Sequence, residues 1–484
     1  MGRRGRGRGA KGRGRGAKRR GTGGGAAGGD VAIDPATLDG VVVPDGTDAL
    51  VAASGRRFDS VLRWRRDAIP GNAGGRVPWY PLATAADDGG RPSRRIGFAV
   101  GDYYLQDAGS LLALAVAGAG GEGLRGSKVL DLCAAPGGKA SALVEAVGDD
   151  GWVMANEPIA SRLPALRFNV ARTGSTRYVV TRMDPDDLAD RLPGRFDLVL
   201  VDAPCSGQSL LSRGRGGATT TRGRTIEHAA ARQRRILDAA VRLTRPGGRL
   251  VYSTCTFAVA ENEAQVQRLV DDGRAVPEPV AGLEAYRSGW DGSVGPATYR
   301  LWPQRDGCAG AFAARVCVVD RAASDVVGDR SRWTVEARPP EEVVRALGEA
   351  MVHREDESFD WRSRLRGGGA SWWFADDGLP EGWDAVAAGG PEVAHRVGTV
   401  WRPAHAAALM RGHVRPRSVV EVDTSAAVRF WSGETLEDPK DGRSDVSGLG
   451  AGFVAVTHRG VAIGWAKRVG GRLKNHLPPA AIRR

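Results

Sequence analysis

The sequence predicts an α/β fold: a Rossmann-like, doubly wound sheet, with an α+β region before it and a small β-barrel after it. From Lys128 to Cys255, short apolar runs alternate with amphipathic stretches, an order typical of βαβ units and a mostly parallel sheet. Polar residues follow these apolar runs directly, as expected where ligands bind at the carboxyl ends of parallel strands. From Val419 onward, short alternating runs favour a barrel instead.

The individual elements follow from these patterns. The strands expected in the central region are KVLDLC, WVMANE, YVVTRMD, FDLVLVDAP and GGRLVYSTC. Helices are expected between them over SALVEAV, Leu163–Arg172 and His228–Leu243. In the last segment, strands are expected over VVEVD, AAVRFW, FVAVTH and VAIGWAKRV. The tryptophans of the charged stretch before it are expected to pack a core rather than to bind bases; they are Trp361, Trp372, Trp373, Trp383 and Trp401.

Positive charge is concentrated at the start of the chain. The 484 residues carry a net charge of +13, and the first twenty hold eight Arg, two Lys and no acid. Residues 1–30 contain too little apolar surface to offset the entropy of ordering, so we predict a disordered arm. Such a cluster of like charges favours polyanions such as nucleic acid. A solubilising extension without a specific role is the alternative.

Signals for export, membranes and metals are missing from the sequence. The basic N-terminus continues into GTGGGAAGG rather than the apolar core of a signal peptide. The most apolar run, LLALAVAGAG from Leu111, is far shorter than the roughly 20 residues that span a bilayer. The five cysteines form no pair of CxxC motifs, which indicates reduced thiols rather than a zinc site. We therefore expect a cytoplasmic protein without a metal or a membrane partner.

A glycine-containing loop after the first strand predicts a nucleotide-like ligand. Its spacing matches neither the dinucleotide fingerprint nor the phosphate loop. Glu157, at the end of the second strand, is placed to bind ribose hydroxyls, and Asp184 follows the third strand. Together these features predict an adenosyl-ligand site. The residues of the loop are Cys133, Ala134, Ala135, Pro136, Gly137, Gly138 and Lys139.

Two cysteines follow later strands, in turns of small polar residues. Cys205 lies in the string DAPCSG, which begins at Asp202, and Cys255 lies in YSTCT. A thiolate in such a turn can be exposed and reactive. Cys133, Cys308 and Cys317 are interpreted as structural, with Cys133 lining the loop through its backbone. The seven histidines offer no Ser-His-Asp arrangement, since His228 lies in a charged helix.

In order and spacing, the strings LDLCAAPGGK, DAPCSG and YSTCT followed by ENE resemble the RNA 5-methylcytosine methyltransferases. The strings GRVPWYPLAT and GDYYLQDAGSLLAL are similar to that family's N-terminal RNA-binding region. The final GWAKRVGGRLKNHLPPAAIR resembles the PUA-like domain of the RsmF branch, which comprises bacterial 16S rRNA methyltransferases. The resemblance covers most of residues 75–317 and 390–484, and it implies S-adenosylmethionine as the cofactor and RNA as the partner.

The resemblance also implies roles for individual residues. The cofactor loop falls on Cys133 to Lys139, the ribose acid on Glu157 and the adenine-side acid on Asp184. The three remaining motif residues are the acid Asp202, which takes part in both cofactor binding and catalysis, the nucleophile Cys255 and the second cysteine, Cys205. One departure is visible: the family more often continues DAPCSG with an acid or Thr and then Gly, whereas this chain has Gln208, Ser209 and Leu210.

The chemistry fits these residue types. Carbon 5 of cytosine is a poor nucleophile, so a thiolate must first add to carbon 6, and Cys255 is the expected thiolate. Asp202 can hydrogen-bond the ring nitrogen, and Cys205 can assist the later loss of the carbon 5 proton. Glu261 and Glu263 are expected to cap a helix rather than to catalyse. Because stacking hides carbon 6, the target must be single-stranded or flipped out.

Five segments are expected: an arm at 1–30, an N-terminal RNA-binding region at 31–126, a methyltransferase domain at 127–320, an intermediate domain at 321–413 and a PUA-like RNA-binding domain at 414–484. The expected partner is rRNA or the small ribosomal subunit, bound by a monomer. Three alternatives stay open: a tRNA methyltransferase, a non-catalytic ribosome-assembly protein, and a DNA cytosine methyltransferase. The last would use the Pro-Cys thiol as nucleophile and need no second cysteine.

Overall fold

A computed structural model of the chain describes residues 2, 33–71, 74–86, 91–209, 223–319, 338–353, 360–412, 414–439 and 452–483. The chain divides into two units, Met1–Val31 and Ala32–Arg484, and the account below concerns the second. Apart from residue 2, the basic arm predicted at 1–30 lies outside the described residues, and so does Leu210, which follows Gln208 and Ser209.

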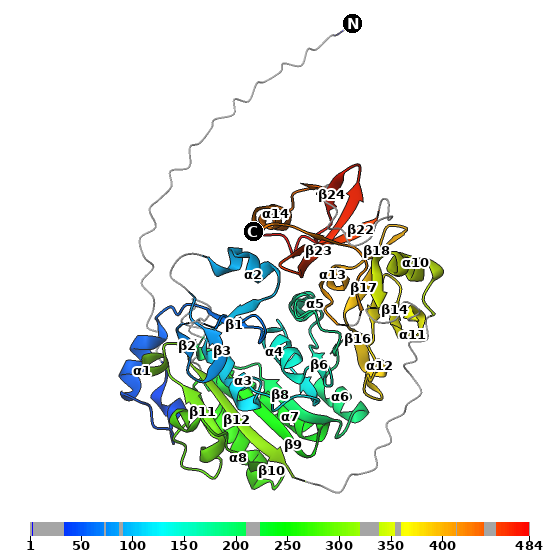
Figure 1. The fold of residues 1–484 in the computed structure, drawn as a ribbon. Coiled ribbons are helices and arrows are strands. Elements are labelled where there is room, and N and C mark those ends of the chain that lie inside the picture. Colours follow the sequence, from blue (N-terminus) through cyan, green and yellow to red (C-terminus); the bar gives the residue numbers. More distant parts are fainter. Residues whose placement is uncertain are drawn as a thin grey trace. The chain divides into compact units, whose positions relative to one another are not determined.

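Among the described residues, the largest sheet has nine strands in the order β10-β12-β9-β8-β5-β6-β7-β16, with β11 also paired to β12 (Figure 1). The central strands β9, β8, β5, β6 and β7 run parallel, and the remaining strands pair antiparallel. The doubly wound α/β fold is therefore confirmed at its centre. The parallel strands are β5 (Lys128–Asp131), β6 (Trp152–Asn156), β7 (Tyr178–Thr181), β8 (Phe196–Asp202) and β9 (Thr244–Thr254). The antiparallel strands are β10 (Ala275–Pro277), β11 (Thr298–Leu301), β12 (Ala311–Val318) and β16 (Ala387–Gly389).

Helices cover both faces of this sheet, which explains why its strands are apolar almost throughout. Neighbouring side chains of β5 enter different cores: Val129 packs with the helices of one face and Leu130 with those of the other. The first face is covered by α3 (Leu112–Ala117), α4 (Gly138–Val147) and α5 (Leu163–Ala171). The second is covered by α6 (Pro185–Arg191), α7 (Gly223–Leu243) and α8 (Glu263–Asp271). Helix α7 begins at Gly223, five residues before the predicted start at His228.

The N-terminal region forms a four-stranded antiparallel sheet in the order β2-β3-β1-β4. Helix α3 lies within the predicted N-terminal region, yet its side chains share one hydrophobic core with β5 and α4. The boundary drawn at residue 126 therefore stays a prediction. The elements are β1 (Val61–Trp64), β2 (Arg76–Val77), β3 (Tyr80–Thr84), β4 (Tyr103–Gln106), α1 (Gly46–Ser54) and α2 (Ile96–Ala99).

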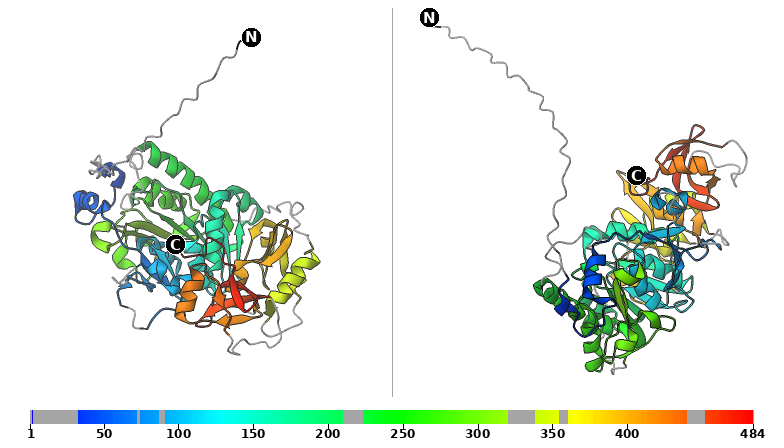
Figure 2. Two further views of the ribbon diagram at one scale, coloured as in Figure 1. Left: turned by 90° about the horizontal axis from the view of Figure 1, so that it is seen from above. Right: turned by 90° about the vertical axis from the view of Figure 1, so that its left-hand side faces the viewer.

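The segment before the C-terminal domain is joined to the nine-stranded sheet. Strand β16 extends that sheet along β7, and Trp383 packs against Phe196 with ring centroids 5.1 Å apart. Figure 2 shows this yellow and orange segment beside the cyan and teal helices of the large sheet. Trp372, Trp373 and Trp383 are buried, as expected for core residues. The segment's own sheet comprises β14 (Leu365–Gly368), β15 (Ser371–Phe374), β17 (Glu392–Val397) and β18 (Val400–Pro403). Its other elements are α10 (Glu341–Ala350), α11 (Trp361–Arg364), α12 (Trp383–Val386), α13 (His405–Leu409), β13 (Met351–His353) and β19 (Val414–Pro416).

The C-terminal domain contains a curled mixed sheet in the order β20-β22-β23-β24-β21. One predicted strand, AAVRFW, is wrong: these residues belong to helix α14 (Thr424–Trp431). The Asp423 carboxylate caps the helix by accepting a hydrogen bond from the Ala426 N–H at 2.8 Å, and Ala427, Phe430 and Trp431 bury one helical face. The strands are β20 (Val419–Glu421), β21 (Leu436–Glu437), β22 (Phe453–His458), β23 (Val461–Val469) and β24 (Arg472–Asn475). In the described part of the chain, none of the helices combines the length and the apolar character that crossing a membrane requires.

Candidate active site

The predicted cofactor loop lies between the carboxyl end of β5 and the start of α4. Gly137 has φ of 110°, and a Cβ added to it would lie 3.1 Å from the Cβ of Asn169. A Cβ on Gly138 would lie 3.0 Å from Cε1 of Tyr104. The positive φ of Gly137 requires glycine, and at Gly138 a side chain would crowd the Tyr104 ring. The two glycines let the chain turn tightly and leave the first amide groups of α4 accessible to a ligand.

Two buried acids end the strands beside this loop. Asp131 is fully buried, and neither of its carboxylate oxygens has a hydrogen-bond partner. Burial, followed by the nearby charge of Asp202, raises the pKa of Asp131 to about 7. Glu157 is 1% exposed; its Oε1 accepts a hydrogen bond from the Ile159 N–H at 3.0 Å, and its Oε2 lies 3.0 Å from Arg162. An unpartnered buried carboxylate fits the ammonium group of an amino-acid moiety, so these residues suit an adenosyl cofactor that carries one.

Asp184 lies at the start of α6, after β7. Its Oδ1 caps the helix by accepting from the Asp186 N–H at 3.1 Å, and its Oδ2 forms an ion pair with Arg235. The side chain is about half exposed. Both carboxylate oxygens of Asp184 therefore have partners within the chain, and its predicted contact with adenine stays a prediction.

The two predicted thiols meet at the carboxyl ends of β8 and β9. The Sγ atoms of Cys205 and Cys255 are 3.1 Å apart, and both cysteines are free thiols. A hydrogen bond from Cys205 stabilises the Cys255 thiolate, which lowers the pKa of Cys255 below its usual 9.0. The same hydrogen bond, together with burial, raises the pKa of Cys205 well above that value. The opposite directions of the two pKa shifts favour a thiolate at Cys255 and a protonated thiol at Cys205, while the backbone N–H of Cys255 donates to the Cys205 sulfur at 3.4 Å.

Asp202 and Lys139 join the thiols to the cofactor loop. The Lys139 ammonium lies 2.7 Å from Oδ2 of Asp202, and Oδ1 of Asp202 accepts a hydrogen bond from the Ser253 hydroxyl at 2.9 Å. The positive charge of Lys139 also lowers the pKa of Cys255, whereas the negative charge of Asp202 raises it. Lys139 of the glycine loop therefore pairs with Asp202 and also stabilises the Cys255 thiolate.

A buried polar network holds the two cysteine loops together. Oε2 of Glu261 accepts from the Ser206 N–H and from Nε2 of Gln233, both at 2.9 Å. Oε1 of Gln208 accepts from the Thr256 hydroxyl and from a backbone N–H, both at 2.8 Å. Because Ser206 follows Cys205 and Thr256 follows Cys255, these side chains set the distance between the thiols.

Glu261 ends a 3-10 turn and Glu263 opens α8, as expected, but the prediction that their side chains cap the helix is wrong. Glu261 binds the cysteine loop, and Glu263 forms a buried, two-pronged ion pair with Arg300, with both N···O distances at 2.6 Å. The partners lie far away in the sequence, so no local pattern could have identified them. Asp131 was recognised as a polar residue at a strand end but was not assigned to the cofactor site, and Gln208 was not predicted as a site residue. Their signals were the position of Asp131 at a strand end and the departure of Gln208 from the family pattern.

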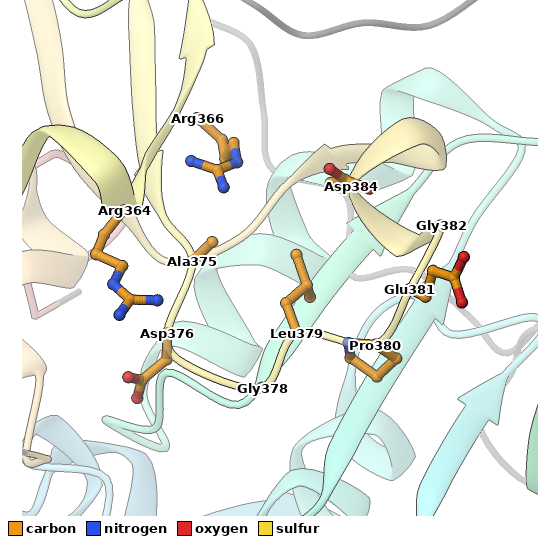
Figure 3. A pocket seen from close by; sticks show the side chains of 10 residues that line it. All are labelled: Arg364, Arg366, Ala375, Asp376, Gly378, Leu379, Pro380, Glu381, Gly382 and Asp384. Carbon is orange, nitrogen blue, oxygen red and sulfur yellow. The ribbon is translucent and has the colours of Figure 1, made fainter. Parts of the chain in front are cut away.

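A separate small pocket, of about 330 Å³, lies around α11, β14 and α12 and contains none of the predicted site residues (Figure 3). Two of its charged groups are engaged within the chain: Arg364 pairs with Asp377, and Asp376 accepts from the Thr176 hydroxyl. Across the described ranges, no three His, Cys, Asp or Glu side chains gather as metal ligands do. The candidate site is therefore the glycine loop together with the two thiols.

Comparison with known proteins identifies the same regions. Residues 123–317 match the family model described as 16S rRNA methyltransferase RsmB/F, and residues 417–483 match the methyltransferase RsmF PUA domain. The ribosomal RNA small subunit methyltransferase F of Aeromonas salmonicida is 28% identical over 433 residues, which cover 87% of this chain and 86% of that protein. The protein of the same name from Klebsiella pneumoniae is 28% identical over 391 residues, or 79% of this chain and 78% of that one. A methyltransferase homologue from Pyrococcus horikoshii of known structure is 22% identical, with a TM-score of 0.49, over 59% of this chain and 99% of that chain. The predicted family resemblance and the PUA-like C-terminal domain are confirmed.

Proposed function

We propose that the chain methylates carbon 5 of a cytosine in ribosomal RNA, with S-adenosylmethionine as the cofactor and through a covalent Cys255 adduct. The proposal is supported by the match of residues 123–317 to the RsmB/F model of 16S rRNA methyltransferases and of residues 417–483 to the RsmF PUA domain. The observation that carries this proposal is the pair of thiols 3.1 Å apart with pKa values shifted in opposite directions. The reaction requires a thiolate that attacks carbon 6, and a second thiol beside it that is still protonated at that stage does not compete for the attack.

The residues that would hold the cofactor are the glycine loop, Asp131 and Glu157. Gly137 and Gly138 let the backbone approach the ligand closely, Asp131 offers an unpartnered carboxylate, and Glu157 offers a second buried carboxylate one strand away. When bound, S-adenosylmethionine supplies an electrophilic methyl group. Asp184 stays a proposed adenine contact.

The chain's own residues perform the other steps. The Cys255 thiolate forms a bond to carbon 6, and the electron pair of the 5,6 double bond moves into the ring, where Asp202 hydrogen-bonds the protonated ring nitrogen. Carbon 5 is then electron-rich and can accept the methyl group. Cys205 then gives its proton to solvent, and its thiolate accepts the carbon 5 proton. The electron pair of that C–H bond re-forms the 5,6 double bond, the Cys255 thiolate leaves carbon 6, and the ring nitrogen releases its proton. Lys139 supports the first step by lowering the pKa of Cys255.

The two cysteines distinguish the proposed RNA methyltransferase from a DNA methyltransferase and from a non-catalytic assembly factor. An enzyme of the DNA type would use the thiol of the Pro-Cys motif, here Cys205, but the pKa of that thiol is raised. A non-catalytic assembly factor would not need Cys255 poised as a thiolate. The RNA that carries the target, rRNA or tRNA, is tested directly by bisulfite sequencing of total RNA from a deletion strain, where loss of one rRNA 5-methylcytosine is expected.

The mechanism is tested by replacing each thiol. Cys255→Ala should abolish methylation and form no covalent adduct, because no bond to the base can begin. Cys205→Ala should accumulate protein joined to RNA, since attack and methyl transfer remain possible while proton removal is slow. Denaturing gels with labelled rRNA from the deletion strain report both results. The reverse pattern would make Cys205 the nucleophile and overturn the proposal.

A further inference from the structure

A large cavity lies away from the thiols and contains none of the predicted site residues. It has a volume of about 1160 Å³ and is lined by α5, the β14-β15-β17-β18 sheet and the C-terminal sheet. Small-molecule sites in proteins occupy roughly 300–1,000 Å³, so this cavity is large enough for a longer ligand. Glycines form part of its lining at Gly367–Gly368 and at Gly389–Gly390, so the backbone is exposed to the cavity there.

Half-buried rings face one another in this cavity. Phe168 of α5 stacks on His405 of α13, with centroids 6.3 Å apart and the planes 11° from parallel. Phe453 of β22 meets His476 edge to face at 5.2 Å. Burial lowers the pKa of His405 to about 4, so its ring is neutral near pH 7. Half-exposed aromatic rings are the surfaces on which unpaired bases stack.

The charge around these rings is positive. Arg167 and Arg402 line the cavity, and the Lys467 ammonium lies 6.0 Å from the centroid of the Phe453 ring. Burial and then the charges of Arg402, Lys474 and Lys467 lower the pKa of His476. The one acid among the lining residues, Glu392, already accepts a hydrogen bond from the Ser371 hydroxyl. Cations beside accessible rings complement a chain of phosphates and bases.

We propose that this cavity binds an unpaired segment of the substrate RNA outside the target cytosine, with bases on Phe168 and Phe453 and phosphates at Arg167 and Arg402. The inference rests on the proposed function for the identity of the RNA, and it adds a second place where the enzyme holds that RNA.

Helix α5 connects this cavity to the cofactor loop. Arg167 and Phe168 line the cavity, whereas Asn169 donates to the Pro136 carbonyl at 2.8 Å and Arg162 donates to the Ala135 carbonyl at 2.6 Å. RNA held in the cavity therefore contacts the helix that supports the cofactor loop. Binding there places the RNA backbone on the side of the sheet where the cofactor loop lies.

The test uses the full chain and a fluorescein-labelled, single-stranded oligoribonucleotide of mixed sequence, with anisotropy measured over a series of salt concentrations. Arg167→Ala/Arg402→Ala should weaken binding and lower the slope of log K against log salt by about 1.4, at about 0.7 per phosphate contact. Phe453→Leu should weaken binding about 5- to 100-fold, while Phe453→Tyr keeps the ring and the affinity. Arg396→Ala is the matched control, because Arg396 is exposed on β17 and does not line the cavity.

Two further measurements separate this inference from the proposed function. Calorimetry with S-adenosylmethionine should give the same affinity for the cavity variants as for the wild type, since the cofactor loop is untouched, and circular dichroism should show that the variants are folded. A lower Tm is expected, because Arg167→Ala loses the hydrogen bond to the Ala388 carbonyl and Phe453→Leu loses ring contact with Trp465. If the wild type methylates rRNA but the arginine and Phe453→Leu variants bind the oligoribonucleotide with unchanged affinity and salt slope, the cavity inference is overturned. If the wild type does not methylate rRNA while these variants still lose RNA binding, the proposed function fails and the cavity remains an RNA site.

Discussion

Replacing Glu261 by Gln removes a buried negative charge. The Glu261 carboxylate follows Cys255 in the chain and accepts a hydrogen bond from Ser206, the residue after Cys205. Oε2 of Glu261 accepts two hydrogen bonds at 2.9 Å, from the Ser206 N–H and from Gln233, and Oε1 is buried without a partner. Tyr252 donates to the Glu261 backbone carbonyl at 2.6 Å, a contact that the substitution leaves in place. Glutamine keeps the shape and one acceptor oxygen, so Glu261→Gln tests the charge itself.

The expected loss of stability follows from these contacts. Two charge-assisted hydrogen bonds become neutral ones, at about 1 kcal/mol each, and a buried amide N–H group without an acceptor costs about 1–3 kcal/mol. The free energy of unfolding should therefore fall by about 3–5 kcal/mol. With an unfolding entropy of about 2.1 cal/mol/K per residue, a unit of roughly 450 residues that unfolds cooperatively should lose about 3–5 °C in Tm.

The pH dependence of Cys205 alkylation is a second measurement, and it distinguishes an effect of Glu261 on the thiols from a general loss of stability. The negative charge of Glu261 is one of the causes that raise the pKa of Cys205, so Glu261→Gln should shift alkylation of Cys205 to lower pH. Glu263→Gln is the matched control, because it weakens the buried ion pair with Arg300 and costs stability without touching Ser206. Iodoacetamide labelling followed by mass spectrometry, repeated across pH, measures both variants. An unchanged Cys205 profile in Glu261→Gln, or an equal shift in Glu263→Gln, would refute the reasoning.

Three further predictions concern charges. Lys139→Met should raise the pKa of Cys255 and move adduct formation to higher pH, since Lys139 lowers that pKa; an unchanged pH profile of adduct yield would exclude this role. The folded-state pKa of Asp131 is raised from 3.8 to about 7, so ionising this carboxyl costs stability progressively as pH rises through that window. Asp131→Asn should therefore gain up to about 4 kcal/mol relative to the wild type between pH 4 and pH 8, and a constant difference in Tm across pH would contradict this. Deleting residues 1–29 should lower the salt slope of RNA binding by about 0.7 per lost phosphate contact without changing the methylated position, which bisulfite sequencing checks.

Much of the central fold was predictable because its signals are local. The apolar runs that form β5 to β9 are buried on both faces, so their composition alone marks them as strands. The AAVRFW run failed because its alternation matches a strand over six residues, while the Asp423 cap and the spacing of Ala427, Phe430 and Trp431 favour a helix. Both signals are present in the sequence, and burial against the C-terminal sheet decides between them.

The sequence by itself determined which chemistry this protein carries, since the glycine loop and the two cysteines are recognisable from residue type and spacing. Tertiary structure alone decided how that chemistry is poised. Glu261 and Gln208 reach their partners across turns that folding brings together, and Lys139, in the first turn of α4, meets Asp202 at the end of β8. The 3.1 Å separation of the thiols and the opposite shifts of their pKa values exist only in the folded chain. The physical reason is that hydrogen bonding, burial and charge act through space, between residues that the chain order separates by as many as 63 positions.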